Sequence, residues 1–217
     1  MSTDRPGRPN RPARRDLGSV WAIVPLRGLA TAKTRLSPSL DDAERRALVI
    51  AMAARTLTAT RDATRLSGTV LVTMDEAAAR LATGFGARAV VQRLPGLNAA
   101  IAEGVALARE RGATATLVLP IDLAAVEAGL LDEVAAAADT VAGGRPVVVV
   151  VPDRHGTGTN ALLVAPARTI EPAFGPDSRA AHRAAAEAAG AVLLELGGSL
   201  TLDVDTPADL LAVEADG

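Results

Sequence analysis

Short apolar runs alternate along the chain with Ala-rich stretches that favour helix. Continuous apolar runs bounded by turn residues are typical of buried strands. They predict strands at residues 20–26, 69–74, 87–92, 114–120, 146–152, 161–165, 192–196 and 200–204. The intervening stretches and their polar starts predict helices at residues 41–60, 98–111, 130–138 and 178–189, and two more from Asp75 and Pro207.

The alternation of strands and helices predicts an α/β protein with a mostly parallel sheet flanked by helices. The predicted strands are continuously apolar rather than alternating, which indicates that helices cover both faces of the sheet. In such folds ligands bind beside the carboxyl ends of the strands. Chemistry is therefore expected in the loops that follow Leu26, Pro120, Pro152 and Val204.

The composition changes sharply before the first predicted strand. Residues 1–18 are rich in Pro, Gly and Arg, which predicts a disordered basic tail followed by one domain at residues 19–217. An arm that binds nucleic acid is the alternative, and it is disfavoured because no aromatic side chain stands among those arginines. The chain has only three aromatic residues, so its core must be mainly aliphatic.

The rest of the composition excludes several classes of function. The net charge of −2 provides no basic field for nucleic acid, and no apolar run approaches the ~20 residues of a membrane span. Without cysteine the chain has no disulfide or thiol nucleophile, and two histidines are too few for a His-built metal site. A soluble cytoplasmic protein is expected, and homo-oligomerisation stays open.

A cationic loop follows the first predicted strand and carries Arg27, Lys33 and Arg35 within ten residues. A P-loop requires Gly directly before its Lys, and Ala32 stands there, which disfavours an NTPase of that type. A lysine at this position still suits an incoming triphosphate. A solvated basic loop is the alternative interpretation.

Acidic residues follow two other predicted strands. Asp122 comes after the fourth strand, and Asp203 and Asp205 lie on one face of an extended segment near the C-terminus. Mg²⁺ prefers one or two carboxylates together with phosphate oxygens, so Asp122 and Asp203 are candidate metal ligands. Helix capping is the alternative, and it applies most to Asp205 before Thr206 and Pro207.

Two Gly-containing segments complete the candidate chemistry. Residues 153–160 combine Gly with hydroxyl side chains and can expose backbone N–H groups to an anion. Residues 174–178 open a helix, whose N-terminus can bind phosphate or carboxylate. Ser178 is alternatively only a helix cap. His155 and His182 have no evident partner and are expected at the surface or in loops.

In their order and spacing these segments resemble the family of phosphoenolpyruvate or 2-phospho-L-lactate guanylyltransferases of coenzyme F420 biosynthesis. The resemblance covers roughly residues 20–213. It is carried by residues 32–36, 97–100, 122–123, 153–154 with 156–159, 174–178 and 203–207. One position departs from the family, because Ala124 stands where Pro usually follows Asp-Leu, so the turn lacks the stiffness of proline.

The resemblance implies a single Rossmann-like nucleotidyltransferase domain, with GTP as the donor, phosphoenolpyruvate as the acceptor and Mg²⁺ as the cofactor. It implies catalytic roles for Lys33 and Arg35. The remaining implied contacts are Arg27 and Lys33 with the nucleotide, Asp122 and Asp203 with Mg²⁺, and Thr159, Gly175 and Ser178 with phosphoenolpyruvate. Asn98, at the head of a predicted helix, is a candidate for reading the guanine base.

The implied reaction transfers GMP from GTP to phosphoenolpyruvate and yields enolpyruvoyl-2-diphospho-5'-guanosine and pyrophosphate. The acceptor phosphate is already an anion near neutral pH, since its second pKa is about 6, and it needs no general base. One alternative is the same transfer to 2-phospho-L-lactate or another phospho-acid. Others are a transferase acting on a molybdopterin or sugar phosphate, disfavoured by the single Gly28 in the loop, and a non-catalytic nucleotide-binding relative, disfavoured by Lys33, Asp122 and Asp203.

Overall fold

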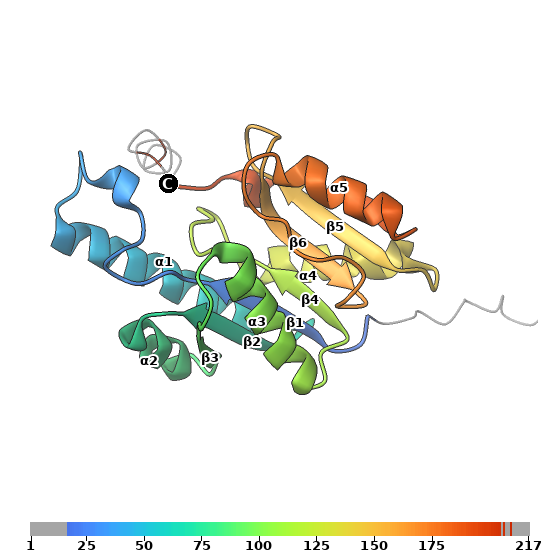
Figure 1. Ribbon diagram of the computed structural model, residues 1–217, viewed down its shortest axis with the longest axis horizontal. Helices are drawn as coiled ribbons and strands as arrows, with labels where there is room; N and C mark the ends of the chain where they lie inside the picture. Colours follow the sequence, from blue (N-terminus) through green and yellow to red (C-terminus); the bar gives the residue numbers. More distant parts are fainter. Residues whose placement is uncertain (1–16, 205, 207–208, 210–217) are drawn as a thin grey trace, which may run out of the picture.

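The computed structural model describes residues 17–204, 206 and 209, which form a seven-stranded sheet between two layers of helices (Figure 1). The strands are β1 (Val20–Pro25), β2 (Leu66–Thr73), β3 (Arg88–Val91), β4 (Ala115–Val118), β5 (Val147–Pro152), β6 (Thr159–Ala165) and β7 (Val192–Glu195). The helices are α1 (Asp42–Asp62), α2 (Glu76–Gly84), α3 (Leu97–Glu110), α4 (Ala128–Ala142) and α5 (Ser178–Ala188). Short 3₁₀ turns occupy Thr34–Leu36 and Ser199–Thr201.

The strand order is β3-β2-β1-β4-β6-β5-β7, and every pairing is parallel except those of β6 with β4 and β5. This confirms the prediction of a mostly parallel sheet. The chain fills one side of β1 with β2 and β3 before it returns to the other side at β4. The carboxyl ends of β1 and β4 therefore form a topological switch point, where α/β folds bind their ligands.

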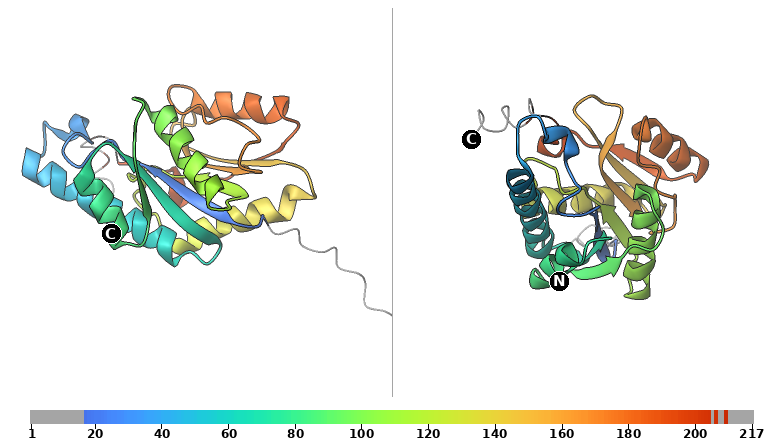
Figure 2. Two further views of the ribbon diagram at one scale, coloured as in Figure 1. Left: turned by 60° about the horizontal axis from the view of Figure 1, so that its bottom comes forward. Right: turned by 60° about the vertical axis from the view of Figure 1, so that its left-hand side comes forward.

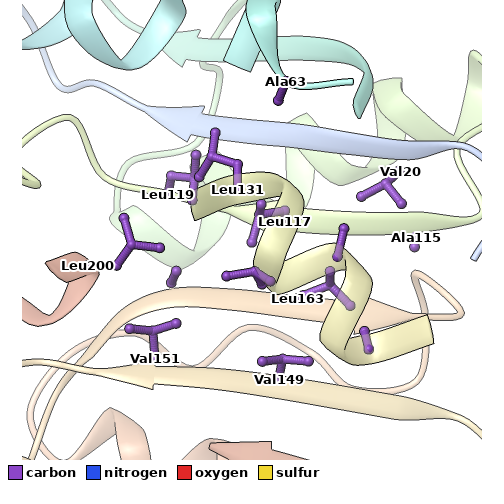
Figure 3. Packing of buried hydrophobic residues seen from close by; sticks show 14 of the residues in the cluster. Val20, Ala63, Ala115, Leu117, Leu119, Leu131, Val149, Val151, Leu163 and Leu200 are labelled. Atoms are coloured by element: carbon purple, nitrogen blue, oxygen red, sulfur yellow. The ribbon is translucent and has the colours of Figure 1, made fainter. Parts of the chain in front are cut away.

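Helices cover both faces of the sheet, as the continuous apolar strands predict (Figure 2). Helices α1, α2 and α4 pack on one face, and α3 and α5 pack on the other. In Figure 3, Leu131 of α4 lies beside Leu119, and Leu117, Leu163 and Val149 of three adjacent strands belong to the same cluster. Burying one such aliphatic side chain contributes about 1.5–3 kcal/mol, which makes this aliphatic core the main source of stability.

Local signals in the sequence set where the first two long helices begin. Asp41 accepts the N–H groups of Ala43 and Glu44, and the Glu44 carboxylate accepts the N–H of Asp41, which completes a capping box. Asp75 caps α2 in the same way through the N–H groups of Ala77 and Ala78. Both starts agree with the predicted ones.

The prediction of a strand at residues 200–204 is wrong. Ser199–Thr201 forms a 3₁₀ turn, and beyond it the chain pairs with the loop after β4 through an isolated antiparallel bridge between Asp203 and Leu123. Among the described residues this bridge is not extended into a strand.

The two ends of the chain mostly lie outside the described residues. This holds for residues 1–16 of the predicted tail and for Pro207, where the last predicted helix begins. Leu17, the first described residue, donates its backbone N–H to the carboxylate of Asp139 in α4 over 2.7 Å. In the part of the chain that the structure describes, no helix is long and apolar enough to cross a membrane.

Candidate active site

The cationic loop after β1 is anchored by Asp75, which the sequence reading identified only as the start of a helix. The Asp75 carboxylate accepts the N–H of Leu29 over 2.9 Å with one oxygen and caps α2 with the other. The Leu29 hydrogen bond, acting against burial, holds the pKa of Asp75 below its ordinary value. One carboxylate thus fixes the loop to the neighbouring βα unit at the carboxyl edge of the sheet.

Lys33 is the cation that this loop brings to the candidate acids. It lies in the left-handed region at φ 58°, which is uncommon for a residue other than glycine. Its side chain is only 7% exposed, and Nζ forms an ion pair with the Asp122 carboxylate. Arg35 lies exposed in the following 3₁₀ turn, and Arg27 lies exposed near the end of β1.

Lys33 is also the only lysine in the sequence, in which every other long cationic side chain is arginine. An ammonium is a compact point charge, whereas a guanidinium is a wide planar fork, so the two do not replace each other at a tight site. A single lysine in an arginine-rich chain is a sequence signal for a special role at that position, and the loop motif alone does not provide it. It adds a second reason to treat Lys33 as the candidate cation of the site.

Asp122 and Asp203 are brought together by a short backbone pairing. Val204 donates its N–H to the carbonyl of Asp122, and Ala124 donates its N–H to the carbonyl of Leu202, each over 3.0 Å. A proline at 124 would lack the second donor, so the departure from the family pattern adds a hydrogen bond to this turn. The geometry of the acidic loop is held by pairing with residues 202–204 instead of by a proline ring.

The two acids present a donor set that suits Mg²⁺. Asp122 uses Oδ2 for Lys33, while its Oδ1 is buried and accepts no hydrogen bond from any described residue. A buried carboxylate oxygen in this state is costly unless a cation or a ligand satisfies it. Among the described residues no group of three or more acidic, His or Cys side chains is gathered. Two carboxylates are nevertheless sufficient for Mg²⁺ when substrate phosphates complete its shell.

A cavity of about 220 Å³ lies beside these acids at the switch point. Its wall contains the two candidate metal ligands and all three candidate acceptor contacts: Asp122, Asp203, Thr159, Gly175 and Ser178. The structure therefore gathers into one cavity side chains that come from four separate segments of the chain. The wall also includes Asn160, a residue missed by sequence reasoning, whose amide donates to the carbonyl of Leu200 over 3.1 Å.

The helix start at Ser178 differs from the simple anion site that the sequence suggests. The N–H of Ser178 donates to the carbonyl of Gly175 over 3.2 Å, and the N–H of Arg179 donates to the carbonyl of Thr157 over 3.1 Å. These first two donors of α5 are therefore engaged within the protein. Ser178 is 2% exposed and lines the cavity, so its hydroxyl is the donor that it can still offer.

A second cavity of about 420 Å³ adjoins the first, and Pro25 and Leu97 line both. Arg27, Gln92 and the exposed Met74 belong to its wall. Asn98 is not part of this wall. Its amide is paired on both sides with the backbone of Phe174, donating to the carbonyl over 2.9 Å and accepting the N–H over 2.8 Å.

The expected surface or loop position of His182 is wrong, whereas His155 is indeed exposed in the β5–β6 loop. His182 lies in α5 and is fully buried, 3.0 Å from the Thr159 hydroxyl through Nδ1, and its Nε2 accepts the Ala173 N–H over 2.9 Å. The sequence signal for its burial was the spacing, because His182 lies four residues from Ser178 and four from Ala186, the other buried positions of α5. This spacing places all three on the inner face of the helix.

Acidification should destabilise the fold through His182. Burial lowers its pKa from the ordinary 6.5 to about 4. Between these two pH values the unfolded chain binds a proton at this ring and the folded protein does not. The stability contributed by the neutral ring is complete above the unfolded pKa and is lost as the pH falls toward the folded one. From about pH 7 to about pH 5, wild type should lose about 2 kcal/mol more free energy of unfolding than His182→Asn.

Denaturant unfolding at the two pH values measures this difference. The exposed His155 provides the control, since His155→Gln should lose as much stability on acidification as wild type does. Equal losses in wild type and in His182→Asn would contradict the buried neutral state of the ring.

The sheet order, with a ligand cavity at its switch point between a cationic loop and two acids, defines a nucleotidyltransferase. Solved structures of other enzymes share the fold. A 4-diphosphocytidyl-2C-methyl-D-erythritol synthase from Anaerococcus prevotii matches with a TM-score of 0.62 over 93% of this chain and 96% of its own, at 11% identity. The Mg²⁺ and UDP complex of glucosyl-3-phosphoglycerate synthase from Mycobacterium tuberculosis matches with a TM-score of 0.58 over 89% and 74%, at 11% identity.

The sequence comparison is more specific. The profile of the family described as "Guanylyl transferase CofC like" matches residues 20–217, and the chain belongs to this family. A phosphoenolpyruvate guanylyltransferase from Conexibacter woesei is 41% identical over 202 residues, which cover 90% of this chain and 87% of the relative. One from Streptomyces scabiei is 42% identical over 198 residues and covers 88% of each chain.

Proposed function

We propose that this protein transfers GMP from GTP to phosphoenolpyruvate in coenzyme F420 biosynthesis. The observation that carries the proposal is the single cavity that joins two carboxylates to Thr159, Gly175 and Ser178. Relatives about 40% identical over most of the chain bear the name of this activity, which supports the choice of donor and acceptor. The products are enolpyruvoyl-2-diphospho-5'-guanosine and pyrophosphate.

The acceptor binds in the smaller cavity. Phosphoenolpyruvate carries a carboxylate and a phosphate, and the hydroxyls of Thr159 and Ser178 are donors for such anions. Both residues are less than a tenth exposed, so their hydroxyls act where little water competes. Gly175 lets the ligand approach the backbone, because an added Cβ would meet no heavy atom within 4 Å and would project into open space.

The donor nucleoside binds in the larger cavity. Its wall combines apolar surface from Met74 and Leu97 with the carboxamide of Gln92 and the guanidinium of Arg27. An apolar wall with a few polar groups is typical of sites for small ligands. Because the two cavities adjoin at Pro25 and Leu97, a nucleotide in the larger one can direct its phosphates toward Lys33 and the acids. Asn98 holds the loop at Phe174, which lines the smaller cavity, and its role in reading guanine stays a prediction.

Mg²⁺ would be held by Asp122 and Asp203, and when bound it would neutralise negative charge on the phosphate oxygens of the donor. Lys33 supplies the protein's own charge to the same place. Its ammonium is paired with Asp122 and can transfer its hydrogen bonds to a phosphate that enters the cavity. Arg35 lies on the same turn and adds to the positive field.

The transfer then requires only positioning and charge neutralisation. An oxygen of the acceptor phosphate forms a bond to the α-phosphorus of GTP, and the bond from that phosphorus to the bridging oxygen of the β-phosphate breaks. The electron pair leaves with pyrophosphate, and no proton has to be removed from the attacking oxygen, because its pKa of about 6 leaves it ionised. Holding the two anions in line is the main contribution of the site.

Substitution of Gly175 should weaken the binding of phosphoenolpyruvate and leave the binding of GTP nearly unchanged. Gly175 has φ +141°, which L side chains rarely adopt, and its added side chain would narrow the mouth of the acceptor cavity. We expect Gly175→Val to raise the KM for phosphoenolpyruvate by about tenfold, the cost of displacing one charged hydrogen bond, with the KM for GTP nearly unchanged.

The matched control is Gly190→Val, which also replaces a glycine with positive φ and open surroundings but lies after α5. It should leave both KM values unchanged. A collapse of GTP binding in Gly175→Val, with phosphoenolpyruvate binding preserved, would mean that the two substrates are assigned to the wrong cavities.

A screen of nucleotides against acceptors tests the proposed function. The purified protein is incubated with each nucleoside triphosphate and with phosphoenolpyruvate, 2-phospho-L-lactate or 3-phosphoglycerate, and the adducts are identified by mass. The expected product is enolpyruvoyl-2-diphospho-5'-guanosine, the adduct of GMP with phosphoenolpyruvate. A stronger signal with 2-phospho-L-lactate would make that compound the acceptor in the same class of reaction. The absence of any adduct would refute the proposed activity.

A further inference from the structure

The buried ring of His182 connects two parts of the wall of the acceptor cavity. On one side Nδ1 lies 3.0 Å from Oγ1 of Thr159, at the start of β6. On the other side Nε2 accepts the N–H of Ala173 over 2.9 Å, and the ring meets Phe174 edge-on with the centroids 5.0 Å apart. The reaction proposed above assigns no role to this residue.

The contact with Ala173 fixes the tautomer of the ring. A backbone amide can only donate, so Nε2 must accept and carries no hydrogen. A neutral imidazole then holds its single hydrogen on Nδ1. The only polar atom recorded next to Nδ1 among the described residues is Oγ1 of Thr159, which therefore accepts from His182.

This bond in turn fixes the hydroxyl of Thr159. A threonine hydroxyl has one hydrogen to donate and two lone pairs with which to accept. His182 occupies a lone pair, so the hydroxyl hydrogen is left for another partner, and it bonds to no acceptor recorded among the described residues. Thr159 lines the cavity, and the hydrogen is therefore available to a ligand there.

We propose that His182 is a positioning residue that holds the Thr159 hydroxyl as a hydrogen-bond donor to an anionic oxygen of the acceptor. The inference rests on the proposed function, since it names the partner of one group in the same cavity. The contact with Ala173 adds a second effect: together with Asn98, which pairs with the adjacent Phe174, it fastens the segment that leads to Gly175.

The tautomer can be measured without any enzymatic activity. The chain has two histidines, and His155→Gln removes the exposed one, so the ring nitrogen signals of His182 are the only ones left in ¹⁵N-labelled full-length protein. Long-range correlation spectra near neutral pH should show a protonated Nδ1 and an unprotonated Nε2. A hydrogen on Nε2 would overturn the inference, whatever reaction the protein catalyses.

Two conservative variants separate the two contacts of the ring. The amide nitrogen of Asn lies near the position of Nδ1, so His182→Asn retains a donor for Thr159. The terminal amide of Gln lies near Nε2, so His182→Gln retains an acceptor for Ala173 and loses the donor. We expect His182→Gln to raise the KM for phosphoenolpyruvate by about tenfold and His182→Asn to restore it to within about threefold, because a hydrogen bond to a charged group is at stake.

The double variant with Thr159→Val completes the test. Thr159→Val alone should raise the same KM, and adding His182→Gln to it should change little, because both remove one interaction. In all of these variants the KM for GTP should stay within about twofold of the wild-type value. If His182 had only a structural role, its substitution would change the KM for GTP and the melting temperature together. Additive effects of the two substitutions would overturn the inference. Wild type that releases no pyrophosphate would refute the proposed function instead, and the nitrogen spectra would still decide the role of His182.

Discussion

Replacing Lys33 by alanine is expected to lower turnover by a factor on the order of a hundred or more while the fold remains intact. The ammonium is nearly buried, is paired with Asp122 and is the single lysine of the chain. Its charge faces the place where the proposed donor carries its phosphates. Removing a preorganised charge from such a site affects the transition state more than the ground state, because negative charge develops there during transfer.

Lys33→Met is the matched control, since it keeps the aliphatic stem and the Cβ at φ 58° and removes only the charge. It should be as inactive as Lys33→Ala, and Lys33→Arg should recover part of the activity at most. The Asp122 carboxylate loses its ion-pair partner in the first two variants, so thermal unfolding must show that they are still folded. Near-normal turnover in folded Lys33→Ala would exclude this role.

The single lysine also offers a direct probe of binding. Protein labelled with ¹⁵N in lysine should show one side-chain ammonium signal, that of Lys33. Addition of GTP and Mg²⁺ should shift that signal as the ammonium exchanges a carboxylate for a phosphate partner. An unchanged signal at saturating nucleotide would place the phosphates elsewhere.

Activity should require Mg²⁺ or Mn²⁺, and Asp122→Asn and Asp203→Asn should each lower it by about a hundredfold or more. The motivation is the pairing that gathers the two acids in one cavity and leaves the buried Oδ1 of Asp122 without a hydrogen bond from the described residues. Removing one of two carboxylates halves the negative charge that holds the ion. Titration with Mn²⁺, followed by its paramagnetic signal, should show weaker binding in both variants.

Asp203→Asn is the cleaner of the two tests, because Asp122→Asn also disturbs the ion pair with Lys33. Asp62→Asn, at the exposed end of α1, serves as the control and should change neither activity nor metal binding. Asp205 lies outside the described residues, and Asp205→Asn should be measured beside them. Full activity in excess chelator would refute the metal requirement, and loss in Asp205→Asn alone would move the ligand assignment to that residue.

The strands and helices could be predicted because local signals determine them. The valine run of β5 is buried on both faces, and the caps at Asp41 and Asp75 mark the starts of α1 and α2. The strand order could not be predicted, since β6 pairs antiparallel with the preceding β5 and also inserts beside the distant β4. Residues 200–204 alternate apolar and polar like a strand, yet in the described part of the chain their sheet pairing is limited to the bridge at Leu123.

Some residues of the candidate site could likewise be predicted from the sequence, and others could not. Asp122 follows the carboxyl end of β4, so its place at the ligand-binding edge of the sheet follows from the fold class. Thr159 begins β6 and reaches the same edge only because this strand runs antiparallel. Asp75 and His182 act through bonds to the backbone of Leu29 and Ala173, and no local pattern in the sequence reveals such long-range contacts. They could be recognised only after the segments were placed beside each other in space.

The most direct test of the account is pyrophosphate release from GTP by the purified full-length protein with Mg²⁺, measured with and without phosphoenolpyruvate. We expect release that depends on phosphoenolpyruvate and is accompanied by equal amounts of enolpyruvoyl-2-diphospho-5'-guanosine. We also expect little release from CTP or UTP. Two results would contradict the transfer of GMP to phosphoenolpyruvate by this protein. One is release of pyrophosphate that is independent of any phospho-acid, and the other is no release with any acceptor when GTP is bound.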